Sequence, residues 1–114
     1  MIDATFIVPN NAGGVYQGLS NKYSAIETPT WALLLAESCR AINLNVSIID
    51  TLAENLSDSQ TLERLKKNTT KAIIFVVYGQ NVNAGTTNMS GAIRLSKLIK
   101  KNLSTRICFI GSHV

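Results

Sequence analysis

The chain has few of the residues that build metal centres and covalent cross-links. Its 114 residues include two cysteines and one histidine. Cys39 and Cys108 lie far apart, each within an apolar run, and no C-x-x-C pair is present. This pattern predicts two reduced, buried thiols and gives no indication of a cysteine-based metal or redox site.

Long apolar runs are also missing. No run approaches the roughly 20 residues that a helix needs to span a bilayer, and residues 1–4 lack the basic start of a signal peptide. Only 16% of the residues are charged, whereas 46% are hydrophobic, which favours a folded chain over a disordered one. We expect a single cytoplasmic domain that covers residues 1–114 and has no membrane partner.

Concentrated charge is the third absence. The net charge is +4 and the sequence pI is about 9.3, which would be compatible with nucleic-acid binding. However, the basic residues are scattered, and most fall on the polar sides of two expected helices. We therefore interpret them as solvated helix faces and expect no nucleic-acid partner. They are Lys66, Lys67, Lys71, Arg94, Lys97, Lys100, Lys101 and Arg106.

The stretch 71–87 gives the clearest indication of the fold. Residues 72–78, AIIFVVY, form an uninterrupted apolar run rich in β-formers. A strand that is apolar on both faces must be covered on both faces, which predicts the middle of a parallel sheet. Glycine and asparagine break the run over 79–85, and a helical pattern follows from about Asn88.

The rest of the chain repeats this alternation of strand and helix. Further strands are expected at 4–8, 46–50 and 106–110, and Ser57 with Gln60 forms a capping box that begins a short helix. Alternating strands and helices predict parallel strands with right-handed crossovers. We expect a three-layer α/β fold, flavodoxin-like or Rossmann-like, with strand order 2-1-3-4.

A helix is predicted to follow the segment 9–28. Thr28 is a suitable N-cap, and Pro29 suits the first helical position. Trp31, Leu34 and further apolar residues up to Ile42 follow helical spacing, so we expect this helix to be well buried. Trp31 is interpreted as a core residue or as the wall of a pocket.

Three loops should converge where the parallel strands end, at the switch point between strands one and three. Segments 9–18, 79–86 and 111–114 are rich in glycine, asparagine and serine and contain almost no charge. This composition suits a large neutral or polar ligand rather than a bare metal or a polyphosphate. The long segment 9–28 could equally be a plain flexible loop. The predicted binding residues are Pro9, Asn10, Asn11, Gly13, Tyr78, Gly79, Gln80, Asn81, Val82, Gly111, Ser112 and His113.

Catalytic signatures are absent. The chain has no nucleophile elbow, no H-E-x-x-H and no paired acids near the expected site. Asp50 ends the second strand, where an acid would bind ribose in a dinucleotide-binding fold, but PNNAGG after the first strand is not the G-x-G-x-x-G cradle. We therefore expect a binding module that is not catalytic by itself.

Taken in order, several segments resemble one family over nearly the whole chain. They are a strand ending in Pro-Asn, a loop with Tyr23, the helix start TPTWALLLA at 28–36, VSIID at 46–50, LSD at 56–58 and IGSHV at 110–114. This order is similar to the N-terminal cobalamin-binding domain of cobalamin-dependent radical-SAM enzymes. Ser112 stands where the family usually has a second glycine.

The resemblance implies a cofactor and a larger enzyme. Cobalamin would bind base-off, without a histidine from a D-x-H-x-x-G motif on its cobalt, because the loop after strand one has no histidine. His113 would be a polar contact rather than a ligand. The chain looks like a fragment truncated after strand four, and the partner would be a radical-SAM barrel that carries the iron–sulfur cluster and S-adenosylmethionine. The expected reaction of the whole is methyl transfer.

Two other functions remain open from the residues alone. The same loops would suit a flavodoxin-like domain that binds flavin or a nucleotide, and the chain could be an interaction domain without a ligand. The fourth strand would also be a sheet edge, with either Ile107 and Phe109 or Cys108 and Ile110 poorly covered. Because such edges pair with other chains, we expect self-association.

Overall fold

The computed structural model describes residues 1–10, 29–78 and 82–111, with 82–87 as backbone only. Within these ranges strands and helices alternate along the chain, as the sequence predicts. The elements are β1 (Ala4–Val8), α2 (Thr30–Arg40), β2 (Val46–Asp50), α3 (Asp58–Lys67), β3 (Ala72–Val77), α4 (Val82–Asn102) and β4 (Arg106–Gly111).

The four strands form one parallel sheet in the order β2-β1-β3-β4. Phe6 of β1 is paired with Ile48 of β2 on one side and with Ile74 of β3 on the other. Ile74 in turn is paired with Cys108 of β4. The predicted fold class and strand order are therefore confirmed.

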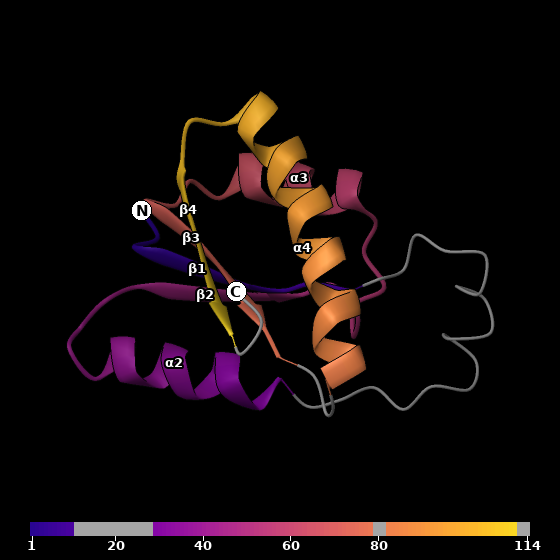
Figure 1. The fold of residues 1–114 in the computed structure, drawn as a ribbon. Coiled ribbons are helices and arrows are strands. Elements are labelled where there is room, and N and C mark those ends of the chain that lie inside the picture. Colours follow the sequence, from indigo (N-terminus) through magenta and orange to yellow (C-terminus); the bar gives the residue numbers. More distant parts are fainter. Residues whose placement is uncertain (11–28, 79–81, 112–114) are drawn as a thin grey trace.

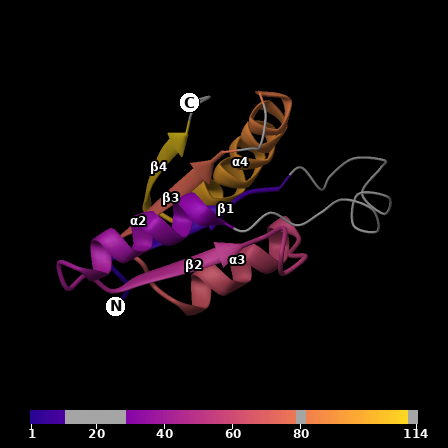
Figure 2. The ribbon, with the colours of Figure 1, turned by 90° about the horizontal axis from the view of Figure 1, so that it is seen from below.

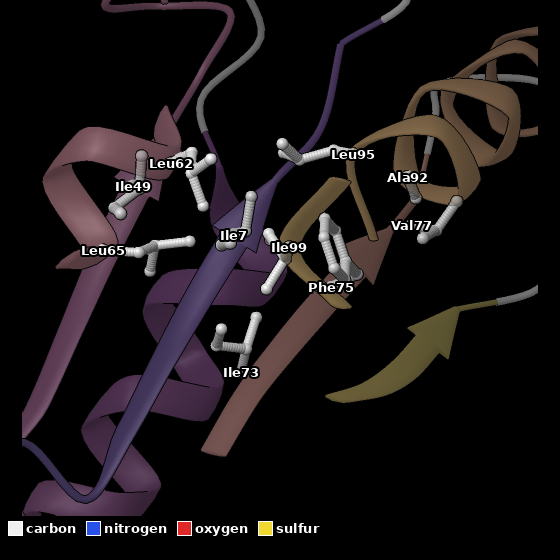
Figure 3. Packing of buried hydrophobic residues seen from close by; sticks show 10 residues of the cluster. All are labelled: Ile7, Ile49, Leu62, Leu65, Ile73, Phe75, Val77, Ala92, Leu95 and Ile99. Atoms are coloured by element: carbon white, nitrogen blue, oxygen red, sulfur yellow. The ribbon is translucent and has the colours of Figure 1, made fainter. Parts of the chain in front are cut away.

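The helices cover both faces of the sheet. Figure 1 shows α3 and α4 on one side of the strands and α2 on the other. The main core lies between the sheet and the pair α3 and α4, and Figure 3 shows how its side chains meet. It consists of Ile7, Ile49, Leu62, Leu65, Ile73, Phe75, Val77, Ala92, Leu95 and Ile99.

A smaller core lies under α2. Ala32 and Ala36 of the helix pack with Phe6 and Val76 of the sheet. Phe6 is adjacent in sequence to Ile7 of the main core, and Val76 is adjacent to Phe75, because successive side chains of a strand point to opposite faces. The apolar run in β3 is therefore explained by burial on both faces.

The expectation that α2 is well buried is wrong. Trp31 is 52% exposed, Leu34 55% and Ile42, just after the helix, 69%. In the described part of the chain, α2 is the one helix on its face, and it lies over β1 and β2 (Figure 2). Only the stripe that carries Ala32 and Ala36 reaches the sheet. The helix begins at Thr30 with Pro29 as its N-cap, and the predicted cap, Thr28, lies outside the described residues.

Two further details differ from the sequence prediction. The α4 helix begins at Val82 rather than near Asn88, so most of the expected loop 79–86 is helical. Each residue added to an existing helix gains a hydrogen bond, which explains how a helix anchored by apolar residues extends into a stretch with little apolar periodicity.

Cys108 is exposed rather than buried, because α2 does not reach β4. Cys39 is half-buried, and both thiols are free.

Polar contacts define the start of α3 and join this helix to α4. The Ser57 hydroxyl accepts from the Gln60 N–H at 3.1 Å, and the Gln60 side chain accepts from the Ser57 N–H at 2.8 Å, which confirms the capping box. Arg94 of α4 donates to both carboxylate oxygens of Asp58, at 2.6 and 3.2 Å. This hydrogen-bonded carboxylate raises the pKa of the Arg94 guanidinium.

Candidate functional site

The carboxyl ends of β1, β3 and β4 lie at one edge of the sheet. From β1 the chain crosses to β2 through α2 on one face, and from β3 it crosses to β4 through α4 on the opposite face (Figures 1 and 2). The strand order therefore reverses between β1 and β3. Such a topological switch point is where open α/β sheets bind ligands, because the two connections diverge and leave a crevice between them.

Asn10 follows β1 at this edge and is held by Thr51. The Asn10 side-chain amide donates to the Thr51 hydroxyl at 3.0 Å, and that hydroxyl donates to the Val8 carbonyl at 2.7 Å. The Thr51 N–H donates to the same carbonyl at 3.1 Å. Thr51 is only 3% exposed. These bonds join the end of β1 to the residue that follows β2.

Gly91 holds Asn10 from the other side. A Cβ atom placed on Gly91 would overlap the backbone carbonyl of Asn10, so the α4 helix and the segment after β1 are in direct backbone contact. No other residue type fits there without displacing one of them. Asn10 therefore lies between the end of β2 and the middle of α4, and its backbone position is defined by both.

Tyr78 follows β3 and is held by two helices. Its backbone carbonyl accepts from the Asn88 side-chain amide of α4 at 3.1 Å. Its ring stacks on Trp31 in the first turn of α2, with 5.0 Å between ring centroids and an interplanar angle of 22°. The carboxyl end of β3 is thus connected to the helices on both faces of the sheet.

Gly111 ends β4 at the same edge. It is paired with Val77 of β3, and an added Cβ would overlap the Val77 carbonyl. A side chain here would therefore separate the ends of β3 and β4.

The described residues of the predicted site gather at this edge. Pro9 and Asn10 are buried at the end of β1, Tyr78 follows β3, Val82 begins α4 and Gly111 ends β4. The remaining predicted residues lie outside the described part of the chain. They are Asn11, Gly13, Gly79, Gln80, Asn81, Ser112 and His113.

Three residues that shape this edge were missed by sequence reasoning. Thr51 comes directly after a strand that neighbours β1, so its position next to Asn10 could have been found from the strand order. Gly91 is an isolated glycine inside a helical pattern, which often signals a close packing contact. The sequence predicts Asn88 only as the start of a helix, and nothing in the sequence indicates its bond to the Tyr78 carbonyl.

Most of the described polar groups at this edge are neutral. The side chains of Asn10, Thr51 and Asn88 are amides and a hydroxyl. Asp50 ends β2 there, but its carboxylate accepts from the Ala53 N–H at 3.1 Å within a local turn. Among the described residues, no three histidine, cysteine, aspartate or glutamate side chains lie together as a metal site. The described side chains at this edge can donate and accept hydrogen bonds, and no acid–base pair is found among them.

Comparison of the chain with family models, with curated protein sequences and with solved structures returned no match in any of the three. Within the ranges that the structure describes, no helix has the length and apolar character needed to cross a membrane.

Proposed function

We propose that this chain is the cobalamin-binding module of a cobalamin-dependent radical-SAM enzyme. The observation that supports this most is the switch point between β1 and β3, where Asn10 and Tyr78 are each held by two other elements. A strand order that diverges at this point leaves room for a large ligand. The order of segments from the Pro-Asn turn to IGSHV supports cobalamin among such ligands.

The chemistry of the described residues fits that cofactor. The rim of a corrin ring carries neutral amide groups, which pair well with amides, hydroxyls and backbone groups. The ring brings its own cobalt, so a cluster of protein metal ligands is not required. When bound, cobalamin would supply a methyl carrier, and the residues of this chain would bind and orient it. Pro9 and Asn10 would do so from β1, Tyr78 from β3 and Gly111 from β4.

The proposal includes residues outside the described ranges and a second domain. Gly79, Ser112 and His113 would contact the corrin or its nucleotide tail. A radical-SAM barrel would carry the iron–sulfur cluster and S-adenosylmethionine, and methyl transfer would require both parts in the cytoplasm. The chain alone would bind the cofactor without turnover.

The test is retention of a corrinoid. Purified chain would be mixed with hydroxocobalamin, passed through a gel-filtration column and examined by visible spectroscopy, with flavin mononucleotide as the competing ligand. We expect corrin absorbance of the base-off type in the protein peak and no retained flavin. Retention of flavin alone would favour the flavodoxin-like alternative. Loss of both ligands would contradict the proposal for this chain.

An Asn10→Ala variant sharpens the test, because it removes the amide that reaches Thr51 and keeps the backbone. Asn102→Ala is the matched control, since Asn102 is exposed at the far end of α4 and donates only to the Leu98 carbonyl, at 2.9 Å, among the bonds described here. We expect weaker corrinoid retention in the first variant and unchanged retention in the second.

A further inference from the structure

The β4 strand is an edge of the sheet, and neither α2 nor α4 packs mainly on it. Among the described residues it pairs with β3 and with no other strand (Figure 2). The α4 helix packs on β3, and α2 lies over β1 and β2. None of the six residues of β4 is buried, whereas four of the six in β3 are. Within this part of the chain, one row of its backbone N–H and C=O groups can therefore pair with a further strand.

The side chains of β4 leave both faces of this edge apolar. Phe109 is on the α4 face, where its ring stacks on Phe75 with 5.3 Å between ring centroids, and Ile107 packs against the same core. Cys108 points to the opposite face and is exposed. Arg106, the first residue, is the only charged residue of the strand. The edge thus carries one charge at one end and none along the rest of its length.

The position of this charge favours antiparallel pairing with a second copy. In a parallel pair in register, the two Arg106 side chains would lie next to one another, and neighbouring like charges are destabilising. In an antiparallel pair centred on Cys108, each Arg106 lies opposite Ile110 of the second copy and about 14 Å from the other Arg106. Each Ile107 then lies opposite Phe109 of the second copy, and pairs of β-branched and aromatic residues stabilise antiparallel strands.

We propose that two copies of this chain pair antiparallel along β4, about a two-fold axis at Cys108, and join their four-stranded sheets into one. A two-fold axis normal to the sheet keeps each face on its own side, and opposite residues share a face, so one residue must lie opposite itself. Centring on Cys108 pairs residues 106–110, whereas centring on Phe109 would bring Gly111, which has no side chain, into the pairing. About four to six hydrogen bonds would join the two strands. This interface is independent of the proposed cofactor.

Disulfide trapping tests the two-fold axis. Every protein carries Cys39→Ala, so that Cys108 is the one thiol of the parent. Diamide oxidises two thiols to a disulfide, and its azo group takes up the two electrons and two protons that they release. The two Cys108 Cα atoms would be about 4.5–5.5 Å apart, within the span of a disulfide, and we expect a covalent dimer. The matched control, Arg106→Cys with Cys108→Ser, should react at least ~10-fold more slowly, because ~14 Å exceeds that span.

A mixture of two variants tests the register. Arg106→Cys and Ile110→Cys, each with Cys108→Ser and one with an affinity tag, would be oxidised separately and together. We expect little covalent dimer from either variant by itself and a mixed disulfide from the mixture, since these two positions lie opposite one another in the proposed pair. Circular dichroism would establish that every variant folds.

The outcomes separate the possible arrangements. Sedimentation velocity of the reduced parent should show a dimer that increases with concentration, and a strictly monomeric parent would overturn the proposal. Equal trapping at 106 and 108 would indicate parallel pairing or random collision and would also overturn it. Trapping at Cys108 without the mixed disulfide would exclude this register. Corrinoid retention is measured separately, so its failure would leave the interface intact, and a failed interface would leave the proposed function intact.

Discussion

Gly91 of α4 lies directly against the backbone carbonyl of Asn10, and no Cβ atom fits between them. The contact joins two segments that are about 80 positions apart in the sequence. It brings the residue that follows β1 under the middle of a long helix, at the edge where the strand order reverses. The shape of the candidate site at this point depends on a residue that has no side chain.

Replacing Gly91 with alanine should therefore displace Asn10. We expect a loss of stability of about 1–3 kcal/mol from overpacking against a backbone atom, partly offset by the ~1 kcal/mol that alanine gains over glycine in a helix. Corrinoid retention should fall as well. Chemical denaturation and ligand retention would measure the two effects.

Ser90→Ala is the control for Gly91→Ala, because Ser90 is the exposed neighbour in the same helix. It should leave retention unchanged and raise stability slightly. Equal retention by Gly91→Ala and wild type would show that the position of Asn10 does not matter for binding.

Thr51→Val should remove two of the hydrogen bonds that join the end of β1 to the residue after β2. Valine keeps the shape of threonine but removes the hydroxyl that accepts from Asn10 and donates to Val8. Loss of buried hydrogen bonds typically costs about 1–3 kcal/mol. We expect a similar loss of unfolding free energy together with weaker corrinoid retention.

Thr61→Val provides the comparison for Thr51→Val. Thr61 is fully buried in the first turn of α3, and its hydroxyl donates to the Ser57 carbonyl at 3.0 Å rather than to a group at the end of β1. This variant should lose stability and bind normally. If both variants bind equally well, the bond between Asn10 and Thr51 serves the fold alone.

The start of the sheet should become less stable in acid. The Asp3 carboxylate accepts from the Asn45 N–H at 2.8 Å and pairs with the Lys71 ammonium at 3.1 Å, and these contacts lower the pKa of Asp3 below its ordinary value. A carboxyl with a lowered pKa stabilises the folded state above the pKa of the unfolded chain, near pH 4. This contribution is lost as the pH falls through the lower, folded value.

Asp3→Asn tests this linkage. The variant should be less stable than wild type at neutral pH, and the difference should narrow below about pH 4, as measured by denaturation across a pH series. Glu37→Gln is the control, because it removes a carboxylate that contacts the exposed Arg40 within α2. The same narrowing in both variants would indicate a general charge effect and contradict a specific role for Asp3.

The sheet could be predicted from the sequence because the apolar run in β3 indicates a strand covered on both faces. A run that is apolar on both faces predicts a strand with neither face exposed to solvent. In the structure, Ile73 and Phe75 are buried on one face of the sheet and Val76 on the other. The sequence also predicts the candidate site at the carboxyl edge, since parallel strands end together, and ligand binding there stays a prediction.

The sequence did not predict which side chains are exposed or which segments touch, because both depend on how the elements pack against one another. Leu34 and Cys108 are apolar in sequence, yet both are exposed. Only the stripe of α2 that carries Ala32 and Ala36 reaches the sheet, and Cys108 lies on β4, which α2 does not cover. Likewise, the contact between Gly91 and Asn10 depends on how far α4 lies from the end of β1. Hydrophobic periodicity predicts which face of a helix is buried, but not the distance between that helix and the end of a strand.

We expect the chain to self-associate through β4. In the described residues this strand pairs only with β3, so one row of its backbone N–H and C=O groups has no strand partner. Arg106 is its only charged residue, and the exposed Cys108 lies at its centre. An edge strand with so little charge favours pairing with a second copy. Sedimentation velocity with a reducing agent should show a mass that rises with concentration.

Cys108→Lys should shift this equilibrium toward the monomer, because a lysine on an edge strand opposes pairing with a second copy. The position is exposed, so the fold should tolerate the change. Ser104→Lys adds the same charge at an exposed residue just before β4 and should leave the association unchanged. A wild-type chain that stays monomeric at high concentration would contradict the prediction, as would equal dispersal by both lysine variants. The second result would assign the association to net charge rather than to the strand edge.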